Sequence, residues 1–227
     1  MSDAPLRLVV FDMDGTLIDS QNAIVHCMGE AFGAAGLACP PREAVLSIVG
    51  LSLPQAMERL APDAAPPVLA RMVADYKHAF VAQRLADGGE ASAPLYPGAR
   101  AALDRLSARD ELLMGVATGK ARRGLDHTFD AHELRGYFVT TQTADDHPSK
   151  PHPSMLERAL AETGARSDSA VMIGDTSFDI EMGRAAGFRT IGVAWGYHPP
   201  QALGAAGADV VIRDFSALDA ALHALWT

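Results

Sequence analysis

The sequence has 227 residues, 48% of them hydrophobic, which is enough to bury a substantial core in one domain, or in one domain with a smaller insert. Lysine and arginine number 19 against 28 acidic residues, so the net charge of −9 argues against nucleic acid and anionic membrane surfaces as partners. No apolar run approaches the ~20 residues of a membrane-spanning helix, and the first residues lack the apolar stretch of a signal peptide. We therefore expect a soluble, cytoplasmic protein, in which Cys27 and Cys39 are ordinary thiols because their spacing matches no metal or redox motif.

Short apolar or β-branched runs, each ended by turn residues, recur along most of the chain. They predict strands at 6–12, 111–118, 137–142, 170–175, 189–195 and 208–214. Helical patterns lie between and after them, at 98–108, 120–132, 151–164, 177–186, 199–206 and 215–225. Strands that are apolar almost throughout and alternate with helices predict an α/β fold, a Rossmann-like parallel sheet with helices on both faces.

The stretch from Ile18 to Ala91 breaks this alternation, because it contains helical patterns and no convincing strand. Ser20 is placed as the N-cap of the first of these helices, and we interpret Asp19 beside it as structural too. Glycine, serine, alanine and proline are frequent in the segment 86–98, which is typical of a linker. The expected domains are therefore an α/β core and an inserted all-helical domain, at 1–16 with 94–227 and at 17–93.

Polar residues stand at the ends of three separate predicted strands: Asp12, Thr118 and Asp175. Because ligands of open parallel sheets bind outside the carboxyl ends of the strands, these side chains are expected in one cleft. The two carboxylates are hard oxygen ligands that suit Mg²⁺ together with a substrate phosphate. Thr118 and Gly119 end a strand and open a helix, so the threonine hydroxyl and the backbone N–H groups can hold phosphate oxygens.

Lysine is rare in this chain, with only Lys77, Lys120 and Lys150. Lys150 lies in a loop with three prolines, which suits a fixed counter-charge for an anion. Each of these residues has an ordinary interpretation when taken alone, since aspartates such as Asp12 and Asp14 commonly form turns and loop lysines are commonly solvated. Their coincidence at one edge of the sheet favours a functional site.

Four segments resemble, in order and context, the four motifs of the haloacid dehalogenase superfamily: FDMDGT (11–16), VATGK (116–120), PSKPHP (148–153) and GDTSFDI (174–180). More narrowly, the chain resembles the branch of phosphoglycolate phosphatases and β-phosphoglucomutases, which carry a helical cap of the C1 type. The resemblance covers essentially the whole chain, and four motifs in register are far more specific than any one of them.

The resemblance implies a catalytic role for each core motif. Asp12 would attack phosphorus to form an aspartyl-phosphate, and Asp14 would protonate the leaving oxygen and later deprotonate water. Mg²⁺ would be bound by Asp12, the Asp14 carbonyl and Asp175. The phosphoryl group would be held by Thr118, Gly119 and Lys150, with Asp179 in a supporting role and with Gly50 and Ser52 of the cap as specificity residues.

The implied function is Mg²⁺-dependent hydrolysis of a small phosphorylated metabolite, with phosphoglycolate as the leading candidate. A sugar-phosphate mutase like β-phosphoglucomutase would keep the same four motifs, so it stays open as an alternative. A catalytically silent binding protein on the same fold is a second alternative, although such proteins usually lack a nucleophile or metal aspartate. A haloacid dehalogenase is disfavoured because it would not need the second carboxylate, Asp14. We expect a monomer or a homodimer.

Overall fold

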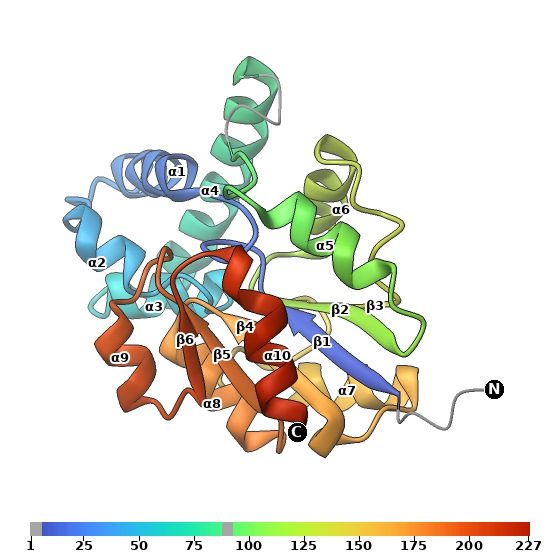
Figure 1. Cartoon of the computed structure of the whole chain (residues 1–227). Helices are drawn as coiled ribbons and strands as arrows, with labels where there is room; N and C mark the ends of the chain where they lie inside the picture. Colours follow the sequence, from blue (N-terminus) through green and yellow to red (C-terminus); the bar gives the residue numbers. More distant parts are fainter. Residues whose placement is uncertain (1–5, 88–92) are drawn as a thin grey trace.

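The computed structural model describes residues 6–87 and 93–227 (Figure 1). Its centre is a six-stranded sheet with the strand order β3-β2-β1-β4-β5-β6, in which every neighbouring pair is parallel. The strands are β1 (Arg7–Phe11), β2 (Leu112–Thr118), β3 (Thr140–Thr143), β4 (Ala170–Gly174), β5 (Arg189–Val193) and β6 (Val210–Ile212). The predicted parallel α/β fold is therefore confirmed.

The two central strands, β1 and β4, carry the uninterrupted apolar runs LVVF and AVMIG, and all of these residues are buried. This pattern arises because both faces of the sheet are covered. Phe11, the last residue of β1, is paired with Val116 of β2 and with Ile173 of β4. The register consequently brings the residues that follow these strands to one edge of the sheet.

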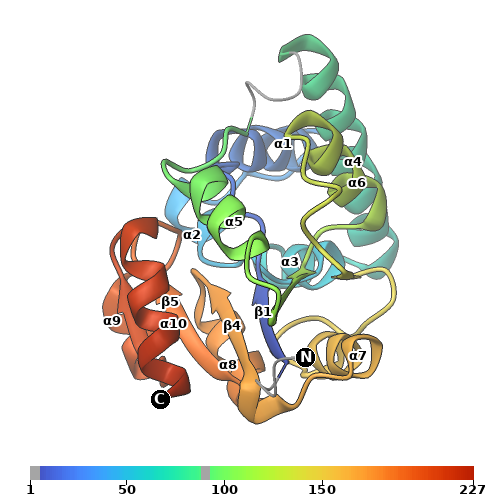
Figure 2. The same ribbon diagram turned by 45° about the vertical axis from the view of Figure 1, so that its right-hand side comes forward.

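Helices cover both faces of the sheet (Figures 1 and 2). Side chains of α5 (Ala99–Ser107), α6 (Arg122–Ala131) and α10 (Leu218–Trp226) share one apolar cluster with the sheet. Side chains of α7 (Ser154–Thr163) and α8 (Ser177–Ala185) belong to a second cluster. The short helix α9 (Pro200–Ala205) lies beside β5 and β6, and single 3₁₀ turns, η2 (Ser167–Ser169) and η3 (Phe215–Ala217), precede β4 and α10.

Four helices follow β1 and form a separate layer: α1 (Gln21–Ala34), α2 (Arg42–Leu46), α3 (Leu53–Leu60) and α4 (Pro66–Asp87). They have their own apolar cluster, which includes Met28, Phe32, Val45, Met57 and Met72. We call α1–α4 the cap helices. The predicted domain boundaries stay predictions, and residues 1–5 of the expected core and 88–92 of the expected linker lie outside the described residues.

The structure differs from the sequence prediction at the third strand, because β3 begins at Thr140 and not at Tyr137. Phe138 stacks on Phe129 at 5.4 Å and lies edge-on to Phe11 at 6.4 Å. These aromatic rings therefore fill the core from a turn, although their β propensity suggested a strand. Within the part of the chain that the structure describes, no helix is both long and apolar enough to cross a bilayer.

Replacing Leu103 by alanine tests the importance of the α5 side of the core. Its side chain is fully buried in the cluster that joins α5 to β1 and β2. Leu103→Ala should lower the free energy of unfolding by about 3 kcal/mol, since it removes apolar contacts and leaves a cavity. Urea unfolding measures this loss, with Ala101→Ser on the exposed side of the same helix as the control. Equal unfolding midpoints for the two variants would show that the buried Leu103 side chain does not stabilise the core.

Candidate active site

The site begins where the chain leaves β1 and turns sharply towards the cap helices. Gly15 makes this turn with a φ of +86°, a conformation that favours glycine. A Cβ atom at Gly15 would overlap the carboxylate of Asp175, and so would one at Gly196. The two glycines therefore let the backbone approach the Asp175 carboxylate from two sides.

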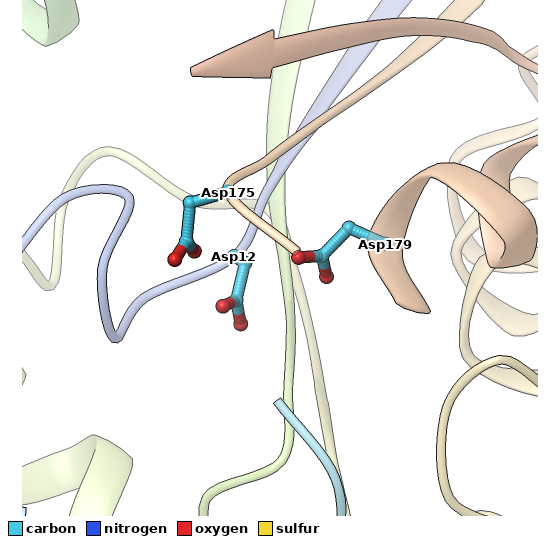
Figure 3. A group of neighbouring side chains, drawn as sticks. All are labelled: Asp12, Asp175 and Asp179. Atoms are coloured by element: carbon cyan, nitrogen blue, oxygen red, sulfur yellow. The ribbon is translucent and has the colours of Figure 1, made fainter. Parts of the chain in front are cut away.

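Asp12, which follows β1, forms an acidic cluster with Asp175 and Asp179 of the segment that joins β4 to α8 (Figure 3). One carboxylate oxygen from each lies within 4.8 Å of the others, and all three residues are buried. Asp12 Oδ2 is buried and has no hydrogen-bond partner among the described residues. A set of hard oxygen donors that includes an unpartnered carboxylate oxygen fits a divalent cation such as Mg²⁺.

The ammonium group of Lys150 is the cationic partner of this acidic cluster. Its Nζ donates to Asp12 Oδ1 at 2.8 Å and to Asp179 Oδ1 at 2.6 Å, and the lysine side chain is completely buried. Asp179 also forms a capping box with Thr176 at the start of α8. Asp179 thus contacts the buried lysine and at the same time caps its own helix.

Asp175 is held by donors on other segments. Thr16 Oγ1 donates to Asp175 Oδ1 at 2.9 Å, and the backbone N–H of Tyr197 donates to Asp175 Oδ2 at 2.8 Å. These two hydrogen bonds fix the plane of the carboxylate. Asp175 is therefore oriented before any ligand binds.

Asp14 lies in a different polar group, on the side of the cap helices. Its Oδ1 accepts from Lys120 Nζ at 2.8 Å and from the Ser20 hydroxyl. The Ser20 and Tyr197 hydroxyl groups are 2.9 Å apart, and because Ser20 gives its proton to Asp14, Tyr197 is the donor between them. The two aspartates of the DxD pair thus have separate partners, with Lys150 on Asp12 and Lys120 on Asp14.

Ser20 is the N-cap of α1 by position, as predicted, but its side chain does not cap the helix. Its side chain makes no cap hydrogen bond, because it is turned towards Asp14. Asp19 Oδ1 instead accepts from the backbone N–H of Gln21 at 3.3 Å, which agrees with its predicted structural role. A capping serine oxygen would accept from an N–H of the first helical turn, whereas the Ser20 hydroxyl here donates to Asp14 and accepts from Tyr197.

A cavity of about 520 Å³ lies between the core and the cap helices, and Asp12, Asp14, Thr118 and Gly119 line it on the core side. Gly119 packs so closely on the cap that a Cβ atom would lie 2.5 Å from the Leu51 carbonyl oxygen. The cap segment around Gly50 and Ser52 therefore contacts the core directly.

The two predicted specificity residues occupy different positions. Gly50 lines the cavity with a φ of +100°. Ser52 is not among the described residues that line the cavity. Its backbone N–H donates to Ser149 Oγ at 2.7 Å. Ser52 thus joins the cap to the loop that carries Lys150.

A family model described as haloacid dehalogenase-like hydrolase matches residues 9–193 of this chain. The chain belongs to this family. The probable phosphatase IndB of Dickeya dadantii (strain 3937) is 34% identical over 96% of this chain and 94% of its own. A phosphoglycolate phosphatase of Photorhabdus laumondii is 26% identical over 94% and 91% of the two chains. A crystal structure of a predicted phosphoglycolate phosphatase from Haemophilus somnus 129PT has the same fold, with a TM-score of 0.84, 19% identity, and 97% and 99% of the chains covered.

Burial shapes the electrostatics of this haloacid dehalogenase-like site. Desolvation, opposed by the Lys150 ammonium, raises the pKa of the Asp12 carboxyl to about 7. Desolvation also raises the pKa of Asp175, and the neighbouring carboxylate of Asp179 adds to the effect. For Lys150, burial alone would lower the pKa, but the Asp12 and Asp179 carboxylates hold it above the usual value. The raised pKa values of Asp12 and Asp175 show that an added positive charge, either a proton or a metal ion, is stabilised in this buried cluster.

Sequence reasoning missed the roles of Thr16, Lys120 and Tyr197. Lys120 could have been found, since it is one of three lysines and follows Gly119 directly. Tyr197 lies more than 170 residues from Ser20, whose hydroxyl it contacts, and no local pattern indicates that contact. Thr16 lies within the FDMDGT segment, but its bond to Asp175 depends on the pairing of β1 with β4.

Lys150→Met tests the buried ion cluster. The substitution leaves the carboxylates of Asp12 and Asp179 without their ammonium partner in a buried site. We expect the free energy of unfolding to fall by about 3–5 kcal/mol in metal-free buffer. Urea unfolding would measure the loss, with Lys77→Met on the exposed surface of α4 as the control. A wild-type midpoint for Lys150→Met would show that the buried pairs are not needed for folding.

Proposed function

We propose that this protein is an Mg²⁺-dependent phosphomonoester hydrolase that acts on a small phosphorylated metabolite through an aspartyl-phosphate. The observation that carries the proposal is the environment of Asp12. One of its carboxylate oxygens is paired with Lys150, and the other is buried and has no hydrogen-bond partner in the part of the chain that the structure describes, although Asp12 lines the cavity. Such an oxygen is available to a metal ion or to an electrophilic phosphorus.

In the proposed reaction, Asp12 attacks phosphorus and the bond between phosphorus and the ester oxygen breaks. Asp14 gives its proton to the departing oxygen, then takes a proton from the water that hydrolyses the aspartyl-phosphate. The separate partners of the two carboxylates support this division of roles, because Asp14 is oriented by Lys120 and Ser20 and not by Lys150. The products are an alcohol and inorganic phosphate.

The remaining core residues would position the phosphoryl group. Lys150 supplies positive charge beside Asp12, while Thr118 and Gly119 line the cavity next to it. Mg²⁺, held by Asp12, Asp175 and the Asp14 carbonyl, would neutralise the charge of the phosphate oxygens. Asp179 supports the site by holding Lys150 and the first turn of α8.

Phosphoglycolate, the substrate predicted from the family resemblance, is one candidate for the metabolite. The named relatives support phosphatase chemistry: the Dickeya protein is named only a probable phosphatase, whereas the Photorhabdus protein and the Haemophilus structure carry phosphoglycolate names. The other expectations from the sequence stay predictions: a cytoplasmic location, no nucleic-acid or membrane partner, and a monomer or homodimer.

Asp12→Asn should abolish Mg²⁺-dependent hydrolysis of 4-nitrophenyl phosphate, because an amide oxygen is a poor nucleophile. We expect a loss of at least a thousandfold in kcat, with the circular dichroism spectrum unchanged. Asp19→Asn, in the same segment but without a contact to the acidic cluster, is the control and should keep its activity. Substantial activity of the Asp12 variant would count against the nucleophile assignment.

Asp14→Asn should separate acid–base chemistry from metal binding. We expect kcat to fall by about 10²–10⁴, which is the usual contribution of a general acid or base. The rise of the melting temperature with added Mg²⁺ should stay close to that of the wild type, since the Asp14 carboxylate lies outside the acidic cluster. A wild-type turnover rate would contradict the acid–base role.

A mutase remains the alternative reading of the same catalytic residues. It would convert one sugar phosphate into its isomer and release little phosphate. Incubation with β-glucose 1-phosphate, with phosphate release and isomer formation followed together, distinguishes the two activities.

A further inference from the structure

The cap side of the cavity is apolar. Among its described lining residues, the buried cap side chains come from α1 and from the segment around α3, and none is charged: Ile24, Met28, Ile48, Val49, Leu51 and Ala56. Helix α4 adds an aromatic pair, Tyr76 and Phe80, whose rings stack at a centroid distance of 6.3 Å. This wall faces the Asp12 and Asp14 side of the cavity, where the leaving group of a phosphate ester would lie.

Among the described lining residues, each cation is either exposed to solvent or already paired with a carboxylate. Lys77 and His78 of α4 and Arg123 of α6 are exposed to solvent. Lys120 is the one lysine or arginine among the described lining residues that is not exposed. Its Nζ is already paired with Asp14 at 2.8 Å and lies over the Phe80 ring at 5.2 Å. A carboxylate on the leaving group would therefore pair with a solvent-exposed cation, where water weakens the attraction, compete with Asp14 for Lys120, or lie against apolar side chains.

The size of the cavity also favours a leaving group other than glycolate. About 520 Å³ falls within the range of sites for ligands much larger than the two-carbon acid glycolate. Removing water from an anion beside apolar side chains costs free energy, whereas burying a methylene group there makes the binding free energy more favourable.

We propose that the site selects phosphate monoesters whose alcohol is uncharged, largely apolar and bigger than glycolate, and that Tyr76 and Phe80 form the specificity-determining wall. This inference rests on the proposed function, since it names the leaving group of the same reaction. The chemistry is unchanged: water replaces the alcohol on phosphorus, and the alcohol leaves with one proton.

The sharpest comparison is between isobutyl phosphate and phosphoglycolate. The two leaving groups have the same branched skeleton of heavy atoms, but two methyl groups replace the carboxylate oxygens. We expect kcat/KM with Mg²⁺ to be at least tenfold higher for isobutyl phosphate. In the n-alkyl series from ethyl to hexyl phosphate, where the leaving-group basicity is nearly constant, kcat/KM should rise two- to fourfold per methylene. Equal or higher efficiency with phosphoglycolate, or a flat alkyl series, would overturn the proposal.

Variants of Phe80 test the wall itself. Phe80 is only partly buried, so the fold should tolerate its replacement. Phe80→Arg should lower the ratio of kcat/KM for isobutyl phosphate over phosphoglycolate by at least tenfold, whereas Phe80→Leu should keep the preference. Ala82→Arg adds the same charge to an exposed position of α4 outside the cavity lining and should leave the ratio unchanged. An unchanged ratio in Phe80→Arg would remove Phe80 from the proposed wall.

The same measurements separate this inference from the proposed function. If no ester in the panel releases phosphate in the presence of Mg²⁺, the proposed function fails. If all esters are hydrolysed and phosphoglycolate is preferred, the hydrolase assignment stands and the inference about the leaving group is wrong.

Discussion

The buried ammonium of Lys150 is the interaction on which the arrangement of the site depends. Three carboxylates within 4.8 Å of one another would be costly to bury without compensation. Lys150 pairs with Asp12 and Asp179, and the Tyr197 backbone and the Thr16 hydroxyl donate to Asp175. These donors come from segments that are far apart in the sequence, so the acidic cluster can form only in the folded chain.

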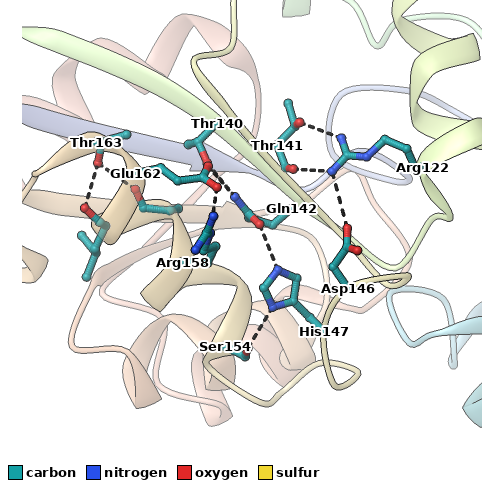
Figure 4. Close-up of polar contacts among 12 residues, drawn as sticks. Arg122, Thr140, Thr141, Gln142, Asp146, His147, Ser154, Arg158, Glu162 and Thr163 are labelled. Carbon is teal, nitrogen blue, oxygen red and sulfur yellow. Dashed lines mark hydrogen bonds and ion pairs between the residues drawn. The ribbon is translucent and has the colours of Figure 1, made fainter.

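The strand order explains how these segments meet. β1 lies between β2 and β4, and their residues are paired in register up to the ends of the strands. The cap helices branch from the chain directly after β1, so they lie over the same edge of the sheet. The strand order and the position of the cap helices therefore place carboxylates of the core on one side of the cavity and apolar side chains of the cap on the other. A second polar network, centred on Gln142 and His147, joins β3 to the start of α7 and so supports the loop that carries Lys150 (Figure 4).

The sequence was informative wherever a residue's position depended on local periodicity. Strand ends such as Asp12 and Asp175 could be predicted, because continuous apolar runs stop there and parallel strands end at a common edge. Side-chain contacts between segments that are far apart in the sequence could not be predicted. Ser20 has the residue type and place of an N-cap, but the Asp14 carboxylate takes its hydroxyl proton. The sequence predicts helices in the segments of α1 and α4, but only their position opposite Asp12 makes their apolar residues part of a binding cavity.

The electrostatic balance of the site links the metal to the substrate. The chain is acidic overall, and the buried cluster holds three carboxylates against one ammonium. A phosphate dianion would be repelled by this cluster, whereas a divalent cation would be attracted and would neutralise the local charge. The apolar cap wall strengthens this effect, because excluding water lowers the local dielectric constant and increases every charge interaction in the cavity. The carboxylates of the core and the apolar side chains of the cap would thus act together, since a bound cation would let an acidic protein bind an anion and the apolar side chains would strengthen the attraction between the two charges.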